Sequence, residues 1–255
     1  MTSRLTLSVL FLAALGVAAP AAQAANLLTN GGFEDPVYAT KTGCWYYCNY
    51  GAGPVSAGTT FAGWTVVDLG AGGVDTSPAR DGYVSLVPNN VFSGYGVSSP
   101  YGIQFADLTG VNGQGKGVRS DAVVTEVGAT YQVSFALGEF WVSGQGSYGE
   151  AAVNVSINGV DQGLFRNQQS LTSAGSDWQT MSFNYVATAT STRLQITNAL
   201  GTGYSYLGTG LDNVSLSYVS GPPVVASVPE PETYALMLAG LGVMGALRRS
   251  RRPTV

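Results

Sequence analysis

The chain has 255 residues, with 11 Lys and Arg, 15 Asp and Glu and no histidine, so its formal net charge is −4 at pH 7. Without histidine, Ser-His-Asp and Cys-His catalytic arrangements and most zinc sites are excluded, because they depend on imidazole. The net negative charge argues against nucleic acid and anionic lipid as partners.

The first 24 residues have the pattern of a secretory signal peptide. Arg4 provides a small positive region, an apolar run follows from Leu5 to Ala19, and Ala22-Gln23-Ala24 forms a small-x-small cleavage site. A buried N-terminal helix is the alternative, but it would not explain why a cleavage site falls at this position. We therefore expect cleavage after Ala24 and export of the rest of the chain.

Residues 37–60 form a segment rich in aromatic residues and glycine that contains both cysteines of the chain, Cys44 and Cys48. In an oxidising compartment we expect these cysteines to close a small disulfide loop. A metal site would need more ligands than the two thiols. A redox role is disfavoured because three residues separate the cysteines and no helix follows them.

Aromatic side chains in two Gly-rich segments are the candidate ligand-binding residues. Their flat apolar faces and polar tips suit the stacking of sugar rings. The alternative is that they cover an open end of the domain and close its core. The residues are Trp45, Tyr46, Tyr47 and Tyr50 in the first segment, and Trp141 and Tyr148 in the second.

The middle of the chain shows the period-two alternation of β-strands and lacks convincing amphipathic helices. Asn158-Gly159, directly after the alternating run 151–157, is a strong hairpin signal. The residues expected to face inward are Tyr131, Val133, Phe135, Leu137, Val153, Val155, Ile157, Met181, Phe183, Tyr185, Leu194, Ile196, Val214, Leu216 and Tyr218. We predict an all-β fold of eight to ten strands, a β-sandwich or jelly roll that forms one domain over 25–227.

Two carboxylates keep an enzymatic alternative open. Glu139 and Glu150 flank the second aromatic loop and could face each other across it, as the paired acids of a glycoside hydrolase do. No motif fixes their separation. We therefore expect a non-catalytic protein and keep a secreted glycoside hydrolase as the alternative.

The end of the chain, 228–252, has the order of a sorting signal. A Pro-Glu-Pro sequence precedes an apolar run at 233–247, and a cluster of arginines follows it. At about 1.5 Å per residue, the run is shorter than a bilayer core of roughly 30 Å, so we expect a single short transmembrane helix. The arginines should remain cytoplasmic. The motif residues are Pro229, Glu230, Pro231, Arg248, Arg249, Arg251 and Arg252.

Removing both ends changes the charge of what remains. Without Arg4 and the four C-terminal arginines, 6 of the 11 bases are left, and without Glu230 and Glu232, 13 of the 15 acids are left, a net charge of −7. The exported domain is therefore more acidic than the whole chain.

The C-terminal order resembles the PEP-CTERM sorting signal of Gram-negative bacteria. The resemblance implies that an exosortase, a membrane transpeptidase-like enzyme, cleaves near Pro229-Glu230-Pro231. It also implies an association with exopolysaccharide. The protein would be tethered to the inner membrane before processing and reach the cell surface or the extracellular space afterwards.

A second resemblance covers the exported domain. The segments NLLTNGGFEDP (26–36), FAGWTVV, DGYVSL, GATYQVSFAL and GLDNVSLS (210–217) are similar in order to galactose-binding-domain-like jelly rolls. Many carbohydrate-binding modules share this layout, so the resemblance implies a polysaccharide ligand. The insertion at 37–60 departs from the pattern, because it replaces a short linker.

The same resemblance suggests one structural calcium ion near Glu34 and Asp212. Asp212 is in register with Val214 and Leu216, so its carboxylate should begin on the inward face, where an unpaired charge is costly. Jelly rolls of this kind bring the turn before Glu34 beside the last strand, often around calcium, which binds carboxylate and backbone oxygens. The alternative is that both acids accept backbone N–H groups in turns.

Overall fold

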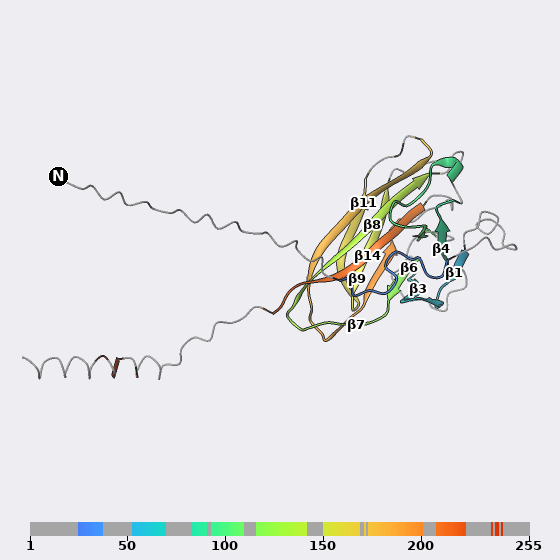
Figure 1. Ribbon diagram of the computed structural model, residues 1–255. Coiled ribbons are helices and arrows are strands. Elements are labelled where there is room, and N and C mark those ends of the chain that lie inside the picture. The colour runs from blue at the N-terminus through green and yellow to red at the C-terminus, as the bar shows by residue number, and fades with distance from the viewer. Residues whose placement is uncertain are drawn as a thin grey trace, which may run out of the picture.

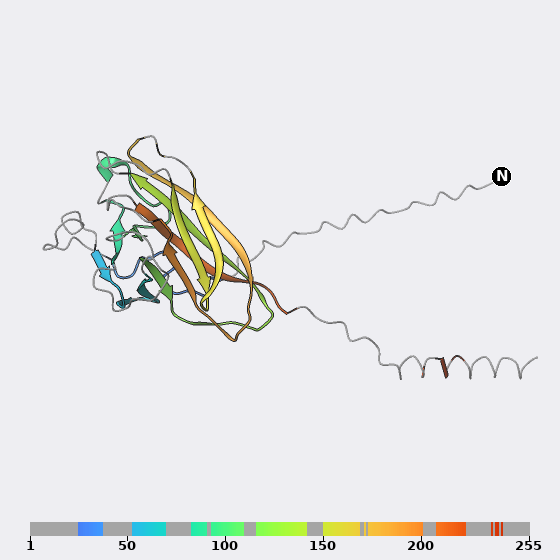
Figure 2. The same cartoon turned by 180° about the vertical axis from the view of Figure 1, so that it is seen from behind.

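The structure is a computed structural model, and it describes most of the exported domain. The described residues are 25–37, 53–69, 83–90, 93–109, 116–141, 150–168, 171, 173–200 and 208–222, together with Leu236, Leu238, Ala239 and Leu241. Within residues 25–222, the regular secondary structure of the described part is almost entirely strand, with one short 3-10 helix, η2, at Ser93–Tyr95. The strands form two facing layers, seen from opposite sides in Figures 1 and 2. The predicted β-sandwich is confirmed.

Sheet A has six antiparallel strands in the order β1-β4-β5-β14-β8-β11. Its two longest pairings join β8 to β11 on one side and to β14 on the other. The strands are β1 Gly53–Ser56, β4 Tyr83–Pro88, β5 Gln104–Asp107, β8 Thr130–Trp141, β11 Gly175–Val186 and β14 Gly208–Ser220.

Sheet B also has six antiparallel strands, in the order β10-β9-β13-β6-β3-β2. A separate two-stranded ribbon pairs β12 with β7. The strands are β2 Thr60–Phe61, β3 Trp64–Asp68, β6 Lys116–Ser120, β9 Ala151–Ile157, β10 Val160–Asn167 and β13 Leu194–Asn198, with β7 Val123–Val124 and β12 Ser191–Thr192 in the ribbon. The short strands raise the number above the eight to ten that the sequence suggested.

The core between the sheets follows the predicted alternation. Val133, Phe135 and Leu137 of β8 are fully buried against Val153 and other apolar residues of sheet B. The hairpin β9–β10 turns at Asn158-Gly159, where both residues have positive φ, 51° and 81°. This is the left-handed conformation that Asn and Gly adopt in two-residue hairpins. The alternation therefore predicts the core well.

In β14 the predicted alternation fails at Asp212. Asn213 has a φ of +48°, and the pairing with β8 shifts between Asp212 and Ser215. Val214 and Leu216 face the core as expected, but Asp212 lies opposite Ala136, on the face of sheet A that points away from the core. The bulge adds a residue to one strand and so reverses the alternation.

Tyr218, near the end of β14, lies on the predicted inward face but is less buried than the other residues of that face. It is 45% exposed, although Val214 and Leu216 of the same strand are buried. A second shift in the pairing with β8 lies between Tyr218 and Ser220. The ring meets that of Tyr131 edge-on, with centroids 5.8 Å apart.

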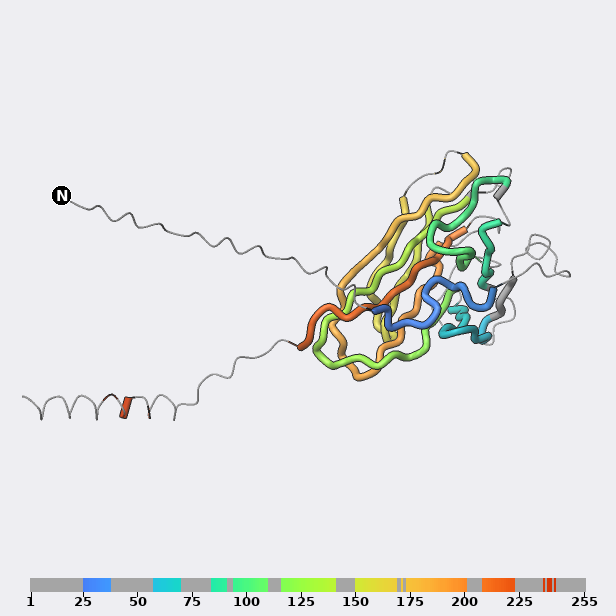
Figure 3. The backbone as a smooth tube through the Cα atoms, viewed as in Figure 1, coloured from blue at the N-terminus to red at the C-terminus, as the bar shows by residue number. Residues whose placement is uncertain are grey.

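The segment 25–37 lies along β14, as Figure 3 shows for the blue and red parts of the tube. Val214 donates its N–H to the carbonyl of Gly31 at 2.8 Å, and Leu27 donates to the carbonyl of Leu216 at 2.9 Å. Position 31 requires glycine, because a Cβ there would overlap the Val214 carbonyl. The two ends of the domain are thus joined, and this arrangement brings Glu34 close to Asp212.

The C-terminal segment is described only in part. Leu236, Leu238, Ala239 and Leu241 are helical. Within the described residues, no helix has the length and apolar character needed to span a bilayer. Most of the helix expected at 233–247 lies outside the described residues.

Candidate functional site

A groove on the outer face of sheet A is the first candidate binding site. It has a volume of about 540 Å³ and lies where β8 and β14 pair. None of the residues that line it carries a charge. They are Asn26, Gln132, Ser134, Asn213, Ser215, Ser217, Tyr218 and Val219, and we call this site the serine groove.

The floor of the serine groove follows from strand register. Ser215 lies opposite Ser134, and Ser217 lies opposite Gln132, while the residues between them, Val133 and Leu216, face the core. The polar side chains therefore form two rows that cross β8 and β14, and these two strands lie about 4.8 Å apart, as neighbouring strands do. On β11, Ser182 and Asn184 continue these rows, because they pair with Ser134 and Gln132.

These polar side chains are not used by the fold. Within the described part of the chain, Gln132, Ser134, Ser215 and Ser217 make no side-chain hydrogen bond. By contrast, Asn26 at the rim is held on both sides: it donates to the carbonyl of Val214 at 2.9 Å and accepts from the N–H of Leu216 at 3.0 Å. The groove thus has a fixed rim and a floor of free donors and acceptors.

Sequence analysis missed the serine groove, although its signal is present in the chain. The polar members of the alternating strands, Gln132 and Ser134 on one strand and Ser215 and Ser217 on the other, were visible as outward residues. Their meeting in a hollow depends on which strands pair, and a single sequence does not show that.

Glu34 and Asp212, the predicted metal ligands, lie close together. Both side chains flank Gly32, since a Cβ there would be in ordinary contact with both, 3.6 Å from Glu34 Cγ and 3.8 Å from Asp212 Oδ1. Glu34 Oε1 accepts the N–H of Ile103 at 2.9 Å, while Glu34 Oε2 is buried and has no hydrogen-bond partner in the described part of the chain.

Asp212 is fully buried and has two partners. Its Oδ2 accepts the hydroxyl of Ser99, and its Oδ1 accepts the N–H of Asn213 at 2.6 Å. Burial raises the pKa of Asp212 from 3.8 to about 7; the two hydrogen bonds oppose this, and the charge of Glu34 adds to it. Each acid accepts one backbone N–H, as the alternative to calcium proposed.

The residues present fit a calcium ion. Calcium takes carboxylate and carbonyl oxygens, and it would neutralise two neighbouring carboxylates, one of which has an oxygen buried without a partner. The described residues contain no group of three or more acidic, His or Cys side chains, so carbonyl oxygens would have to complete the site.

A second buried carboxyl lies on the same face of sheet A. Asp107 of β5 pairs with Gly210 and is almost fully buried. Burial raises its pKa from 3.8 to about 6, although the side chain and backbone of Thr109 both donate to it. The Thr109 N–H lies 2.8 Å from Asp107 Oδ1.

Trp178 covers part of this face beside the buried carboxyls. Its ring lies on Gly138 of β8 and Gly210 of β14, where any Cβ would come within 2.8 Å of ring carbons. It meets Phe105 edge-on at a centroid distance of 5.3 Å, and its Nε1 donates to the carbonyl of Ser98 at 2.7 Å. The residues thus form an aromatic cluster on the outer face.

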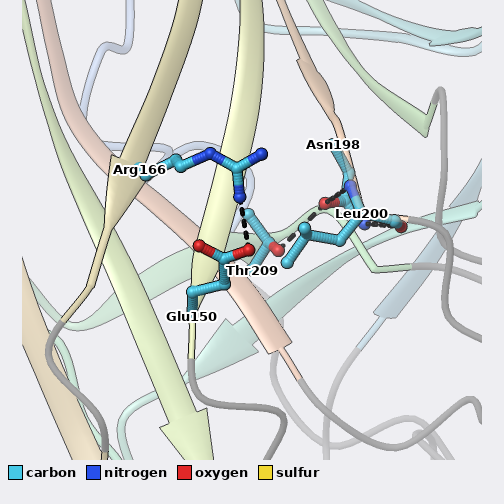
Figure 4. A network of polar contacts seen from close by, with 5 residues as sticks. All are labelled: Glu150, Arg166, Asn198, Leu200 and Thr209. Atoms are coloured by element: carbon cyan, nitrogen blue, oxygen red, sulfur yellow. Dashed lines mark hydrogen bonds and ion pairs between the residues drawn. The ribbon is translucent and has the colours of Figure 1, made fainter.

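Glu139 and Glu150, the residues of the hydrolase alternative, belong to different sheets. Glu139 lies in β8 of sheet A and is 4% exposed. Glu150 precedes β9 of sheet B and forms an ion pair with Arg166 of β10 (Figure 4). The ion pair ties the Glu150 carboxylate to its own hairpin.

Polar contacts near this ion pair serve the fold (Figure 4). Thr209 of β14 donates to Asn198 Oδ1 of β13 at 3.0 Å, which joins sheet A to sheet B. Leu200 donates its N–H to the same oxygen at 3.2 Å. The network fixes the end of the sandwich where Glu150 lies.

The aromatic loops lie outside the described residues. This applies to Trp45, Tyr46, Tyr47, Tyr50 and Tyr148, to Cys44 and Cys48, and to the sorting residues Pro229, Glu230, Pro231, Arg248, Arg249, Arg251 and Arg252. Trp141 is the last residue of β8, but its side chain is not described. The disulfide and the stacking role stay predictions.

Solved structures with a similar fold include cyclases. A cyclase from Fischerella sp. TAU has a TM-score of 0.53 at 17% identity and covers 78% of this chain and 100% of its own. The apo form of a cyclase from Fischerella sp. has a TM-score of 0.52 at 15% identity, covering 78% and 97%. These likenesses show a shared fold.

A carbohydrate-binding module, TmCBM61 in complex with β-1,4-galactotriose, is more distant. Its TM-score is 0.39 at 16% identity, and it covers 76% of this chain and 99% of its own. No curated protein matches the chain in sequence.

The family comparison concerns the C-terminus. Residues 227–252 match the model of the PEP-CTERM protein-sorting motif. The match begins one residue before the expected boundary and ends at the expected residue, Arg252. The chain therefore carries a PEP-CTERM sorting signal, which indicates an exported protein that a sorting enzyme handles at the membrane.

Proposed function

We propose that the protein is a non-catalytic cell-surface or extracellular-matrix protein that is sorted by an exosortase and binds polysaccharide. The PEP-CTERM match at 227–252 supports sorting. The serine groove supports binding, and it is the observation that carries the proposal. A solvated sheet face would also be polar, so the decisive feature is that unused polar groups line a hollow of about 540 Å³.

The chemistry of the serine groove suits an uncharged sugar. Hydroxyl and amide groups both donate and accept, as sugar hydroxyls do, and the groove offers them from Gln132, Ser134, Ser215 and Ser217. Tyr218, which is 45% exposed, also lines the groove. The volume falls within the usual range for small-ligand sites, roughly 300–1,000 Å³.

We further propose that one calcium ion stabilises the domain at Glu34 and Asp212. The ion would be structural, since both residues lie where the segment 25–37 meets β14. Bound calcium would offset the burial of two adjacent carboxylates and fix this junction. It supplies charge and coordination there and takes no part in a reaction.

The groove is tested by a single truncation with a matched control. Gln132→Ala removes an unused amide from the floor, whereas Asn154→Ala removes an exposed amide from β9 of sheet B, outside the lining residues. Loss of one or two hydrogen bonds should weaken glycan binding about 3- to 10-fold for Gln132→Ala. Binding by Asn154→Ala should be unchanged, and calorimetry measures the affinity of both variants.

The aromatic loop provides the competing outcome. If Trp45→Ala abolishes binding and leaves the melting temperature nearly unchanged while Gln132→Ala binds normally, the site is the aromatic loop and not the serine groove. A large loss of stability in Trp45→Ala would instead show that Trp45 belongs to the core. Stacking should contribute on the order of 1 kcal/mol per ring.

A further inference from the structure

A second hollow lies on the outer face of sheet B, opposite to the face of the molecule that carries the serine groove. It has a volume of about 450 Å³ and is lined by Arg119, Arg193, Gln195, Asn158 and Ser191, with Ala122 and Gly159. We call this site the arginine pocket. It belongs to none of the sites described above.

Strand register places the polar side chains of the arginine pocket together. Arg119 of β6 lies directly opposite Gln195 of β13. Their neighbours Val118, Leu194 and Ile196 are buried in the core, so Arg119 and Gln195 point away from it. Two long polar side chains thus stand side by side on the sheet.

The second arginine is held in place by the β9–β10 turn. Asn158 donates its backbone N–H to the carbonyl of Arg193 at 2.9 Å, and its Oδ1 accepts the N–H of Arg193 at 2.8 Å. Its Nδ2 also donates to the carbonyl of Ser191 at 2.9 Å. Asn158 therefore fixes the backbone on which Arg193 and Ser191 lie, and the pocket wall is preorganised.

The charge of the pocket is unusual for this domain. The exported domain has only six basic residues and thirteen acidic ones. Four of the bases are described: Lys116 pairs with Asp68 and Arg166 pairs with Glu150, while Arg119 and Arg193 have no ion pair in the described part of the chain. Both unpaired arginines line the same pocket.

The Arg119 side chain is the strongest indication that the arginine pocket binds a hydrogen-bond acceptor. Its Nε is buried and has no hydrogen-bond acceptor within the described residues. A buried N–H of a charged group without a partner is costly, and an acceptor in the pocket would remove this cost. Gln195 and the Ser191 hydroxyl likewise make no side-chain hydrogen bond in the described part of the chain.

We propose that the arginine pocket binds an anionic sugar residue of an acidic polysaccharide. Guanidinium groups bind planar and tetrahedral oxyanions through paired N–H donors. The Gln195 amide and the Ser191 hydroxyl match the hydroxyl groups that surround such an anion on a sugar ring. The net charge of −7 on the exported domain repels polymers as densely charged as nucleic acid, so a sugar acid with one charge per ring is favoured.

This site is separate from the serine groove and does not depend on it. The serine groove lies on sheet A and has an uncharged lining, whereas the arginine pocket lies on sheet B and has two cationic side chains. A polysaccharide with neutral and acidic residues could therefore contact both faces. An experiment that disproves binding at one site therefore does not disprove binding at the other.

The experiment compares trigalacturonate with its methyl ester, using calorimetry on the full-length protein in low salt. Esterification removes the charge and keeps the sugar. Trigalacturonate should bind at least 10-fold more tightly than the ester, and binding should weaken with added NaCl. A galactose sulfate in the same assay shows whether a carboxylate or a sulfate group is preferred.

Arg193→Gln is the first variant, because this side chain is exposed and its loss should not disturb the fold. It should lower the affinity for the acidic sugar about 10-fold or more. Arg166→Gln is the matched control: it removes the same charge from an arginine on the same sheet, outside the pocket lining. Its affinity for the acidic sugar should equal that of the wild type.

Three results would overturn the proposal. Equal binding of trigalacturonate and its ester would show that charge is not recognised. Unchanged binding by Arg193→Gln would place the ligand elsewhere. Sodium sulfate that competes at the same concentration as the sugar would show a simple anion site without sugar recognition.

Discussion

The buried carboxyl of Asp107 should make the stability of the domain depend on pH. Its pKa is raised to about 6 in the folded protein by burial, against 3.8 when exposed. As pH rises through this window, the unfolded chain ionises first and unfolding is favoured. The stability that this group provides is complete below about pH 4 and is lost as pH rises through 6. With about 1.4 kcal/mol per pKa unit, the loss is roughly 3 kcal/mol.

Asp107→Asn should flatten this part of the pH profile, because the amide oxygen can still accept the Thr109 N–H but cannot ionise. Urea unfolding between pH 4 and pH 8 in the presence of chelator measures the effect. Asp121→Asn, at an exposed position, should keep the wild-type profile. If the Asp107→Asn and wild-type profiles superimpose, burial does not shift this carboxyl.

Asp212 carries the calcium prediction. An ion that binds only the folded state must stabilise it, so calcium should raise the melting temperature and chelator should lower it. Asp212→Asn should lose the response. Asp107→Asn should retain it, since Asp107 is a buried acid of the same sheet face outside the proposed ion site. A wild-type protein without any calcium response has no such site.

At the scale of residues, the resemblance to jelly rolls predicted that Glu34 and Asp212 lie close together, but the alternation did not predict the face on which Asp212 lies. Strict alternation placed Asp212 inward with Val214. The left-handed conformation of Asn213 breaks that alternation, and Asn is one of the few residues that adopt it easily. A bulge of this kind depends on the pairing with β8, so local pattern alone could not locate it.

At the scale of elements, the packing of the Trp178 ring on sheet A depends on glycine in two neighbouring strands. Gly138→Val should destabilise the domain by about 1–3 kcal/mol, because its Cβ would overlap the Trp178 ring. Thermal unfolding followed by circular dichroism measures the loss. Gly94→Ala is the control: a Cβ there meets nothing within 4 Å, so its stability should change little. Equal stability of the two variants would show that the packing of the Trp178 ring does not require glycine at position 138.

The strands themselves were the most predictable elements. Runs such as 131–137 and 151–157 bury every second residue in one core, so composition and period identify them. The serine groove and the arginine pocket were not predictable. Arg119, Asn158 and Arg193 meet only because β6, β9 and β13 are neighbours in sheet B, and pairing over such distances in the chain leaves no local signal.

For the whole molecule, the sorting signal predicts where the protein is found. Deleting 228–252 removes the PEP-CTERM motif and should send the protein directly to the medium. The full-length chain should first appear with the membranes and then be shortened in a host that has an exosortase. Immunoblots of the membrane and medium fractions separate these outcomes. A full-length chain that is never trimmed in such a host contradicts the sorting role.

The measurement that tests the central claim most directly is a glycan screen of the purified protein with a parallel assay for reducing sugar. The account predicts binding to at least one polysaccharide without release of reducing ends. Turnover that Glu139→Gln abolishes would contradict it and establish the hydrolase alternative. Absence of both binding and turnover would show that the domain does not recognise polysaccharide.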